Sequence, residues 1–190
     1  MNFLNQDSES EKTIFVDRDG TLVGTCDANF SAYSAALRHF RISRPSELRE
    51  LFHQGQNWLS VSTEFFPNLE PDVLEKIHQY KAAIFPSFFT QLNWNEDIVE
   101  FISRHHWALV SNGSRTSSLQ ILSQRKYLAP FAVLGPSETL RPKPNPDMFI
   151  SLLTQEGLSQ ATVLVLEDSK IGCKAARSAG LPYKMVPHLC

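Results

Sequence analysis

Three short runs of apolar residues limit the folds open to this chain of 190 residues. The runs lie at 14–16, 108–110 and 163–166, and each is apolar throughout instead of alternating with polar residues. Continuous apolar runs of this length are typical of strands covered on both faces, as in a parallel sheet between two layers of helices. Weaker runs at 131–134 and 183–186 predict two further strands.

Helical patterns separate most of these runs. They lie at 95–104, 116–124, 147–153 and 170–179. At 95–104 the apolar residues share one face, as they do in a helix that packs against a core. Strands that alternate with helices indicate βαβ units. The sequence therefore predicts an α/β fold, with a Rossmann-like parallel sheet flanked by helices.

The stretch between the first two strong strands does not follow this alternation. About 70 residues, 24–93, lie between them, which is too long for one crossover. We predict an inserted α-helical domain at 24–93, with residues 1–23 and 94–190 forming the α/β core. The polar residues 1–12 are expected to be a mobile tail. Helical patterns in the insertion lie at 29–40, at 45–53 and from Pro71 towards Phe89.

Polar residues stand where each strong strand ends. Asp17 follows the first strand, Ser111 and Asn112 follow the second, and Glu167 and Asp168 follow the third. In open α/β sheets, ligands bind outside the carboxyl ends of the strands. We therefore expect these side chains to meet at one edge of the sheet.

The first strand leads into the segment 17–22, in which Asp17 and Asp19 are one residue apart. Two carboxylates this close favour a divalent cation, and hard oxygen ligands suit Mg²⁺. An ionised carboxylate attacks phosphorus without a separate base, and a bound cation removes its repulsion from phosphate. Taken alone, the segment is equally compatible with a turn or a helix cap.

Two further segments are ambiguous one at a time. Lys143 lies between Pro142 and Pro144, which fix the loop and could hold the ammonium against a phosphate. The alternative is an exposed lysine in a proline-rich turn. Ser111 and the amides after it could hold phosphate oxygens, or they could simply form a strand-to-helix turn. The ordered occurrence of all these segments at or beside strand ends favours a site.

Together the segments resemble the four signatures of the haloacid dehalogenase superfamily, in its phosphatase branch. The resemblance covers about residues 13–186. The helical insertion is similar to the cap of the phosphoglycolate phosphatase and β-phosphoglucomutase subgroup. The matching segments are 17–21, Ser111, 143–146, and Glu167 with Asp168.

The resemblance implies roles for single residues. Asp17 would be the nucleophile that becomes an aspartyl-phosphate. Asp19 would donate a proton to the leaving alcohol and then accept one from water. Ser111, Asn112 and Lys143 would hold the phosphoryl group.

The resemblance also implies a magnesium site. Its ligands would be the side chain of Asp17, the backbone carbonyl of Asp19 and the side chain of Asp168, with Glu167 nearby. The presence of Asp19 favours phosphate transfer over dehalogenation, because superfamily members that act on haloacids lack this second aspartate.

One position departs from the capped members of the superfamily. Residue 18, usually apolar in them, is Arg18 here. Arginine at this place occurs in capless phosphatases of the superfamily, which weakens an assignment to the phosphoglycolate branch. Its side chain would either point towards the substrate or form an ion pair, and we expect the ion pair.

The cap of such enzymes closes over the site and reads the leaving group. Thr25, Asn29 and Arg49 are our candidates for contacts with the substrate, with Tyr33 and Gln54 as further ones. The expected activity is Mg²⁺-dependent hydrolysis of a small phosphate monoester, such as a sugar phosphate, by analogy with the family. The alternatives are a β-phosphoglucomutase-like phosphomutase and, less favoured, a noncatalytic or receiver-like phosphoacceptor.

Composition excludes several other classes of protein. The net charge of −2 and the scattered lysines and arginines do not favour nucleic acid as a partner. No apolar run approaches the roughly 20 residues of a membrane helix, and the polar start does not resemble a signal peptide. Three cysteines without a CxxC pair predict reduced thiols in a cytoplasmic protein. We expect a monomer or small homo-oligomer whose partner is a small phosphorylated metabolite.

Overall fold

The computed structural model describes residues 12–53 and 58–190. These residues group into two compact units, each of which is described by itself. Of the expected tail only Lys12 is described, and Gln54 lies outside the described residues. The first unit comprises the described residues up to Val23 together with Trp94–Leu189, and the second those of Gly24–Asn93 together with Cys190.

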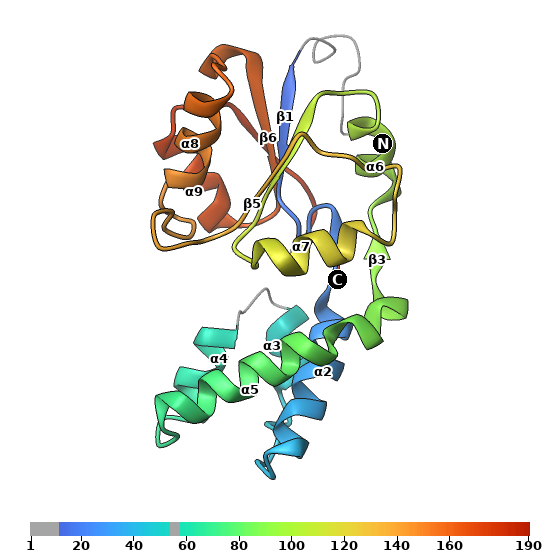
Figure 1. Cartoon of the computed structure of the whole chain (residues 1–190), viewed down its shortest axis with the longest axis vertical. Helices are drawn as coiled ribbons and strands as arrows, with labels where there is room; N and C mark the ends of the chain where they lie inside the picture. Colours follow the sequence, from blue (N-terminus) through green and yellow to red (C-terminus); the bar gives the residue numbers. More distant parts are fainter. Residues whose placement is uncertain (1–11, 54–57) are drawn as a thin grey trace. The chain divides into compact units, whose positions relative to one another are not determined.

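A parallel sheet of five strands forms the centre of the first unit, and its order is β5-β4-β1-β6-β7 (Figure 1). All five expected strands are present, and the predicted α/β fold is confirmed. Strand β1 lies in the middle of the sheet between β4 and β6. The strands are β1 (Thr13–Val16), β4 (Trp107–Val110), β5 (Ala132–Leu134), β6 (Val163–Glu167) and β7 (Tyr183–Met185).

Helices cover both faces of this sheet (Figure 1). Side chains of α6 and α7 share one apolar cluster with one face of the strands. Side chains of α8 and α9 share a second cluster with the other face. The helices are α6 (Glu96–Ile102), α7 (Arg115–Leu122), α8 (Asp147–Gln155) and α9 (Lys170–Ser178), and a short 3₁₀ turn, η2 (Gln160–Thr162), precedes β6.

The continuous apolar runs have a direct structural cause. Successive strand residues face opposite sides of a sheet. In β1, Ile14 and Val16 belong to the cluster under α6 and α7, while Phe15 belongs to the cluster under α8 and α9. Both faces of each inner strand are therefore buried, which leaves polar residues only at the strand ends, where they form the site.

Polar side chains begin three of the helices. The Asn95 side chain accepts from the backbone N–H of Ile98 at the start of α6. Ser114 does the same at α7 and Ser169 at α9. These caps satisfy N–H groups that have no partner within the helix.

The two units are connected by a pair of short strands. The chain leaves the first unit through β2 (Val23–Gly24) and returns through β3 (Asn93–Trp94), and these strands pair with each other. Two-residue strands carry no periodic pattern, so the sequence did not predict them.

The second unit is helical throughout. Aromatic and aliphatic side chains form its core, with Tyr33 stacked on Trp58 at 4.2 Å between ring centroids. Helix α4 was not predicted. The helices are α2 (Cys26–His39), α3 (Leu48–His53), α4 (Trp58–Phe65) and α5 (Pro71–Ile84), followed by the 3₁₀ helix η1 (Phe85–Gln91).

Cysteine pairing corrects one expectation. Cys26 and Cys190 form a disulfide, so the prediction of three reduced thiols is wrong for these two. Their separation of 164 residues follows no spacing rule that a sequence would reveal. Cys173 is free and buried, and burial raises the pKa of its thiol.

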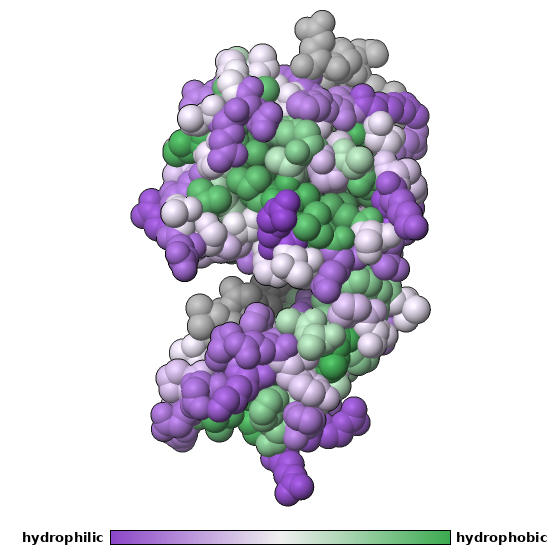
Figure 2. Space-filling model, in the orientation of Figure 1, coloured by the Kyte–Doolittle hydropathy of each residue, from purple (hydrophilic) through white to green (hydrophobic). Residues whose placement is uncertain are grey.

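Five of the described large apolar side chains are exposed, all in the first unit. Figure 2 shows hydrophobic residues beside one another in the middle of the visible face of this unit, with hydrophilic residues around them. None of the described helices is both long enough and apolar enough to cross a bilayer. The exposed large residues are Leu119, Tyr127, Ile150, Ile171 and Met185.

Candidate active site

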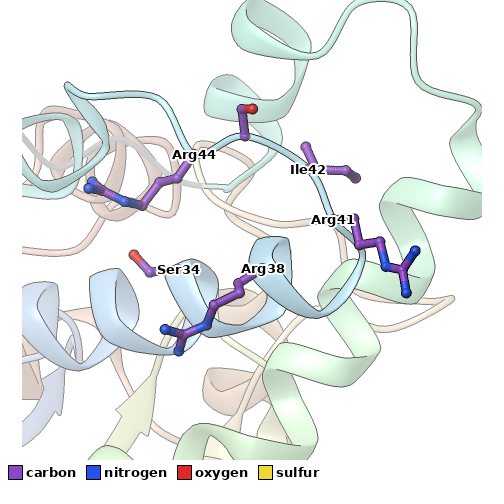
Figure 3. A pocket seen from close by; sticks show the side chains of 6 residues that line it. Ser34, Arg38, Arg41, Ile42 and Arg44 are labelled. Carbon is purple, nitrogen blue, oxygen red and sulfur yellow. The ribbon is translucent and has the colours of Figure 1, made fainter.

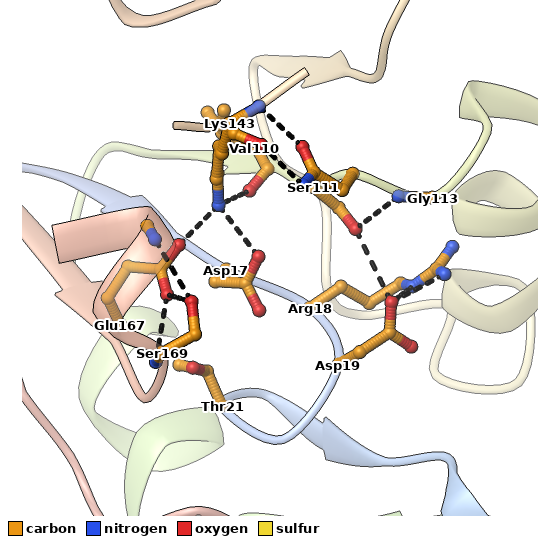
Figure 4. A network of polar contacts seen from close by, with 12 residues as sticks. Asp17, Arg18, Asp19, Thr21, Val110, Ser111, Gly113, Lys143, Glu167 and Ser169 are labelled. Atoms are coloured by element: carbon orange, nitrogen blue, oxygen red, sulfur yellow. Dashed lines mark hydrogen bonds and ion pairs between the residues drawn. The ribbon is translucent and has the colours of Figure 1, made fainter. Parts of the chain in front are cut away.

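Acidic side chains from two neighbouring strands meet at the carboxyl edge of the sheet. Asp17 follows β1, Glu167 is the last residue of β6, the strand paired with β1, and Asp168 comes directly after it. One carboxylate oxygen from each of these three residues lies within 4.8 Å of the other two. Figure 4 shows Asp17 and Glu167 with Lys143 between them. The structure thus brings together acids that are 150 residues apart in the sequence.

Lys143 reaches this cluster from the loop between β5 and α8. Its ammonium donates to Asp17 Oδ1 at 2.7 Å, to Glu167 Oε1 at 2.5 Å and to the carbonyl of Val110 at 2.7 Å. These three bonds use all three donors of a lysine. The side chain is 2% exposed, so the proline-rich turn holds a buried ammonium and not an exposed one.

Asn112 fixes the backbone at Lys143. Its side-chain oxygen accepts from the N–H of Lys143 at 2.7 Å, and its amide nitrogen donates to the carbonyl of Lys143 at 3.1 Å. The side chain therefore binds the lysine loop at both ends of one residue. Asn112 therefore holds the backbone of Lys143 in place, and its expected contact with phosphate stays a prediction.

Glu167 is fully buried and is held from two sides. Its Oε1 binds Lys143, and its Oε2 accepts from the hydroxyl of Ser169 at 2.9 Å. Gly172 of α9 leaves room for it, because a Cβ atom at 172 would lie 1.8 Å from Oε1. A larger residue at this turn of α9 would therefore displace the carboxylate.

Both oxygens of Asp168 are engaged. Oδ1 accepts from the hydroxyl of Thr21 at 2.7 Å, and Oδ2 lies 2.5 Å from Nδ1 of His188. The loop turns at Gly20 with a φ of +83°, which glycine adopts readily. A Cβ atom at this position would also lie only 2.4 Å from Asp168 Oδ2. Nothing in the local sequence of His188 connects it to an acid 20 residues away, so the sequence could not predict this contact.

Burial and neighbouring charges shift the ionisation of two groups in this cluster. Desolvation is the main cause that raises the pKa of Asp17 well above its ordinary value, and the negative charge of Glu167 adds to it. Desolvation alone would lower the pKa of Lys143, but Asp17 and Glu167 together raise it. Lys143 is therefore held as an ammonium. Its positive charge does not fully offset the effects that raise the pKa of Asp17.

These residues suit a divalent cation. Asp17, Glu167 and Asp168 bring three carboxyl groups together, and Lys143 contacts two of them while the imidazole of His188 contacts the third. All the donor atoms are oxygens, which hard cations such as Mg²⁺ prefer.

Asp19 lies beside the cluster with a different partner. Arg18 donates to Asp19 Oδ2 from Nη2 at 2.7 Å and from Nε at 3.0 Å, which forms the expected ion pair. The hydroxyl of Ser111 lies 3.5 Å from the same oxygen and accepts from the N–H of Gly113 at 3.0 Å. The structure thus places Ser111 and Asp19 next to each other (Figure 4).

The cap candidates of the sequence lie in the second unit, where each has a local partner. The Asn29 amide donates to the hydroxyl of Thr25 at 3.1 Å. Arg49 pairs with Asp27 at 2.7 Å on the surface. Tyr33 is buried, and its hydroxyl lies 2.7 Å from Nδ1 of His78. These contacts explain the local structure and assign no ligand.

An open pocket of about 410 Å³ lies at the end of α2 in the second unit. None of the cap candidates lines it. In Figure 3 the guanidinium groups of Arg38 and Arg41 point in different directions, so they do not converge on one anion. The lining residues are Ser34, Arg38, Arg41, Ile42, Ser43 and Arg44.

Comparison with known proteins identifies relatives along nearly the whole chain. Residues 14–186 match the family described as haloacid dehalogenase-like hydrolase. A Thermotoga maritima protein named "Phosphorylated carbohydrates phosphatase" is 24% identical over 178 residues. The matched part covers 90% of this chain and 82% of that protein.

Solved structures resemble the fold closely. CbbY from Rhodobacter sphaeroides, in complex with phosphate, has a TM-score of 0.76 at 20% identity, covering 94% of this chain and 87% of its own. A HAD-superfamily hydrolase of subfamily IA, variant 1, from Geobacter sulfurreducens has a TM-score of 0.70 at 21% identity. That match covers 97% of this chain and 93% of the other. At this level of identity the two structures establish a shared fold.

Proposed function

The chain belongs to the haloacid dehalogenase-like hydrolase family, and from this premise we propose that it is a Mg²⁺-dependent phosphatase acting on small phosphate monoesters. One observation supports this proposal above the others. Asp17 lies in a buried cluster with Lys143, Glu167 and Asp168, beside an aspartate, Asp19, that is fixed by an arginine. Candidates for the nucleophile, the phosphate-binding cation, the metal ligands and the proton carrier thus lie close together in space.

Asp17 and Asp168, with the backbone carbonyl of Asp19 and with Glu167 nearby, would hold the Mg²⁺. When bound, the ion supplies positive charge that lowers the repulsion between carboxylate and phosphate. Lys143 is in place to neutralise a phosphate oxygen, since it already contacts Asp17 Oδ1. The hydroxyl of Ser111 is a further donor for a phosphate oxygen.

The reaction has two steps on Asp17. In the first, a carboxylate oxygen of Asp17 attacks phosphorus, the bond from phosphorus to the ester oxygen breaks, and Asp19 gives a proton to the leaving alcohol. In the second, Asp19 takes a proton from water, the water oxygen attacks phosphorus, and the bond to Asp17 breaks. The products are the alcohol and inorganic phosphate, and both aspartates return to their initial state.

We further propose that the second unit acts as the cap that selects the leaving group. The substrate class is phosphorylated carbohydrates or related metabolites. The name of the Thermotoga maritima relative supports the carbohydrate part of this choice, and the CbbY structure that holds phosphate supports the phosphate part. Thr25, Asn29 and Arg49 remain our candidates for contacts with the rest of the substrate.

Phosphate release from sugar phosphates and from p-nitrophenyl phosphate tests the proposal. The wild-type protein with Mg²⁺ is expected to release phosphate, and EDTA is expected to stop it. Asp17→Asn keeps the shape of the side chain but removes the nucleophile, so activity should fall by about 10⁴-fold or more. Asp97→Asn, an exposed aspartate on α6, is the matched control and should keep full activity.

Three outcomes would contradict the proposal. Undiminished turnover by Asp17→Asn would exclude Asp17 as the nucleophile. A hydroxylamine-sensitive phosphoprotein that accumulates without turnover would favour a phosphoacceptor. Transfer of phosphate between positions of a sugar phosphate, without release, would favour a phosphomutase.

A further inference from the structure

Arg18 is a buried arginine in the middle of the candidate active site. Its side chain is 7% exposed, although the residue lies directly between Asp17 and Asp19 in the sequence. Burying a charge is costly unless it is paired and hydrogen-bonded. All three guanidinium nitrogens meet this requirement through contacts within the first unit.

One side of the guanidinium holds Asp19, and the other side holds α7. Nε and Nη2 donate to Asp19 Oδ2 at 3.0 and 2.7 Å. Nη1 donates to the hydroxyl of Ser118 at 2.9 Å and to that of Ser117 at 3.3 Å. Ser118 is fully buried and its hydroxyl in turn donates to the carbonyl of Ser114 at 3.1 Å. Asp19 is therefore connected to the first turn of α7 through one rigid planar group.

The backbone leaves a defined space for this group. A Cβ atom at Gly113 would lie 2.0 Å from Nη2 of Arg18, so the guanidinium fits only against a glycine. Gly113 follows Ser111 and Asn112 in the loop after β4, the loop that fixes Lys143. The arginine thus connects the segment that carries the nucleophile to the segment expected to bind phosphate.

We infer that Arg18 is a positioning residue that holds the Asp19 carboxyl in place for proton transfer to and from the reacting oxygens. This inference rests on the proposed function. The side chain of Asp19 is 37% exposed, and its two hydrogen bonds to Arg18 limit the rotamers that it adopts. A role as a direct substrate ligand is disfavoured, because Arg18 is buried and its nitrogens are engaged by Asp19 and α7.

Esters with different leaving groups distinguish positioning from a general structural role. An alkyl phosphate needs a proton on its departing oxygen, whereas p-nitrophenolate leaves without one. Arg18→Met removes the guanidinium group and its charge while keeping most of the length of the side chain. Arg18→Lys keeps the charge but loses the pair of parallel N–H donors that bind Asp19. For both variants we expect kcat/KM to fall about 100-fold with alkyl phosphates and less than about threefold with p-nitrophenyl phosphate.

The second chemical step provides another readout. For p-nitrophenyl phosphate, kcat should fall in both variants, because the water that attacks the phosphoenzyme still needs Asp19 as a base. Since kcat/KM for this ester should be nearly unchanged, KM should fall in proportion to kcat. Arg104→Met, an exposed arginine paired with Glu100, is the control and should leave both parameters unchanged. Equal losses in kcat/KM for the two classes of ester, or no loss for either, would overturn the inference.

A readout without turnover separates this inference from the proposed function. Crystal structures of the wild-type protein and of Arg18→Lys should show the Asp19 carboxylate displaced from α7 in the variant. An unmoved carboxylate would overturn the inference even if the enzyme is an active phosphatase. If the wild-type protein releases no phosphate from any ester, the proposed function fails, and the absence of proton transfer overturns this role of Arg18 as well.

Discussion

At the scale of single residues, Asp17 has two requirements that oppose each other. It must be ionised to act as a nucleophile, yet burial and the charge of Glu167 raise its pKa. Lys143 lowers that pKa but cannot fully offset desolvation. A divalent cation would remove the conflict by balancing the remaining negative charge. The cluster therefore suits a divalent cation, in agreement with the proposed Mg²⁺.

This conflict predicts how Asp17→Asn changes stability. When folding raises the pKa of a carboxyl, its contribution to the free energy of unfolding is fully present at pH values below the ordinary pKa of 3.8. This contribution is lost as the pH rises through the raised pKa of the folded state. In EDTA at pH 7 we therefore expect Asp17→Asn to melt at a higher temperature than the wild type. Each 1 kcal/mol corresponds to about 2–4 °C for a chain of this size.

Calorimetry with and without Mg²⁺ checks this prediction. The difference in melting temperature should narrow as the pH falls towards 3.8, and added Mg²⁺ should stabilise the wild type more than the variant. Asp97→Asn should show neither effect. A variant that melts below the wild type in EDTA at pH 7 would contradict the argument.

Single residues also show what the sequence could and could not predict about the site. Asp17, Lys143, Glu167 and Asp168 were predicted together because each stands at a strand end or in an adjoining loop. The contact of Asn112 with the lysine backbone depends on loop geometry, which no spacing encodes. The place of His188 beside Asp168 depends on the path of the chain after β7 and was missed for the same reason. Roles in catalysis stay predictions until activity is measured.

At the scale of helices and strands, α9 is shaped by the residue that it covers. Glycine inside a helix usually costs about 1 kcal/mol relative to alanine. Gly172 is nevertheless required, since a Cβ atom would overlap the Glu167 carboxylate. That carboxylate cannot move away freely, because it is buried and held by Lys143 and Ser169.

We therefore predict that Gly172→Ala destabilises the protein by about 1–3 kcal/mol, despite the better helix propensity of alanine. Displacing Glu167 should also weaken Mg²⁺-induced stabilisation. Urea unfolding measures both effects. Lys174→Ala, on the exposed side of the same helix, is the control and should change stability by no more than about 0.5 kcal/mol. Increased stability of Gly172→Ala would show that the helix adjusts without displacing Glu167.

The elements themselves were largely predictable, for a physical reason. Strands buried on both faces are apolar throughout, so β1, β4 and β6 are visible in the sequence. Strands β2 and β3 have only two residues each, too few for any pattern. Helix α4 was missed in the stretch before Pro71, where aromatic residues in the insertion gave no clear helical period.

At the scale of the whole chain, the disulfide ties the last residue to the start of α2. We predict that the protein, denatured without reductant, exposes one reactive thiol, that of Cys173, and three after reduction. Titration with a thiol reagent in denaturant measures this number. Three thiols without reductant would show that the purified protein lacks the bond, as the sequence alone had suggested.

Finally, the central position of β1 has a consequence for biosynthesis. The strand that carries the nucleophile pairs with residues near 108 on one side and near 165 on the other. A ribosome therefore makes the first strand long before either neighbour exists. During translation this apolar strand must stay out of aggregates until the strands that pair with it have been made. The candidate active site is complete only after the final third of the chain, which contains Lys143 and Glu167, has been made.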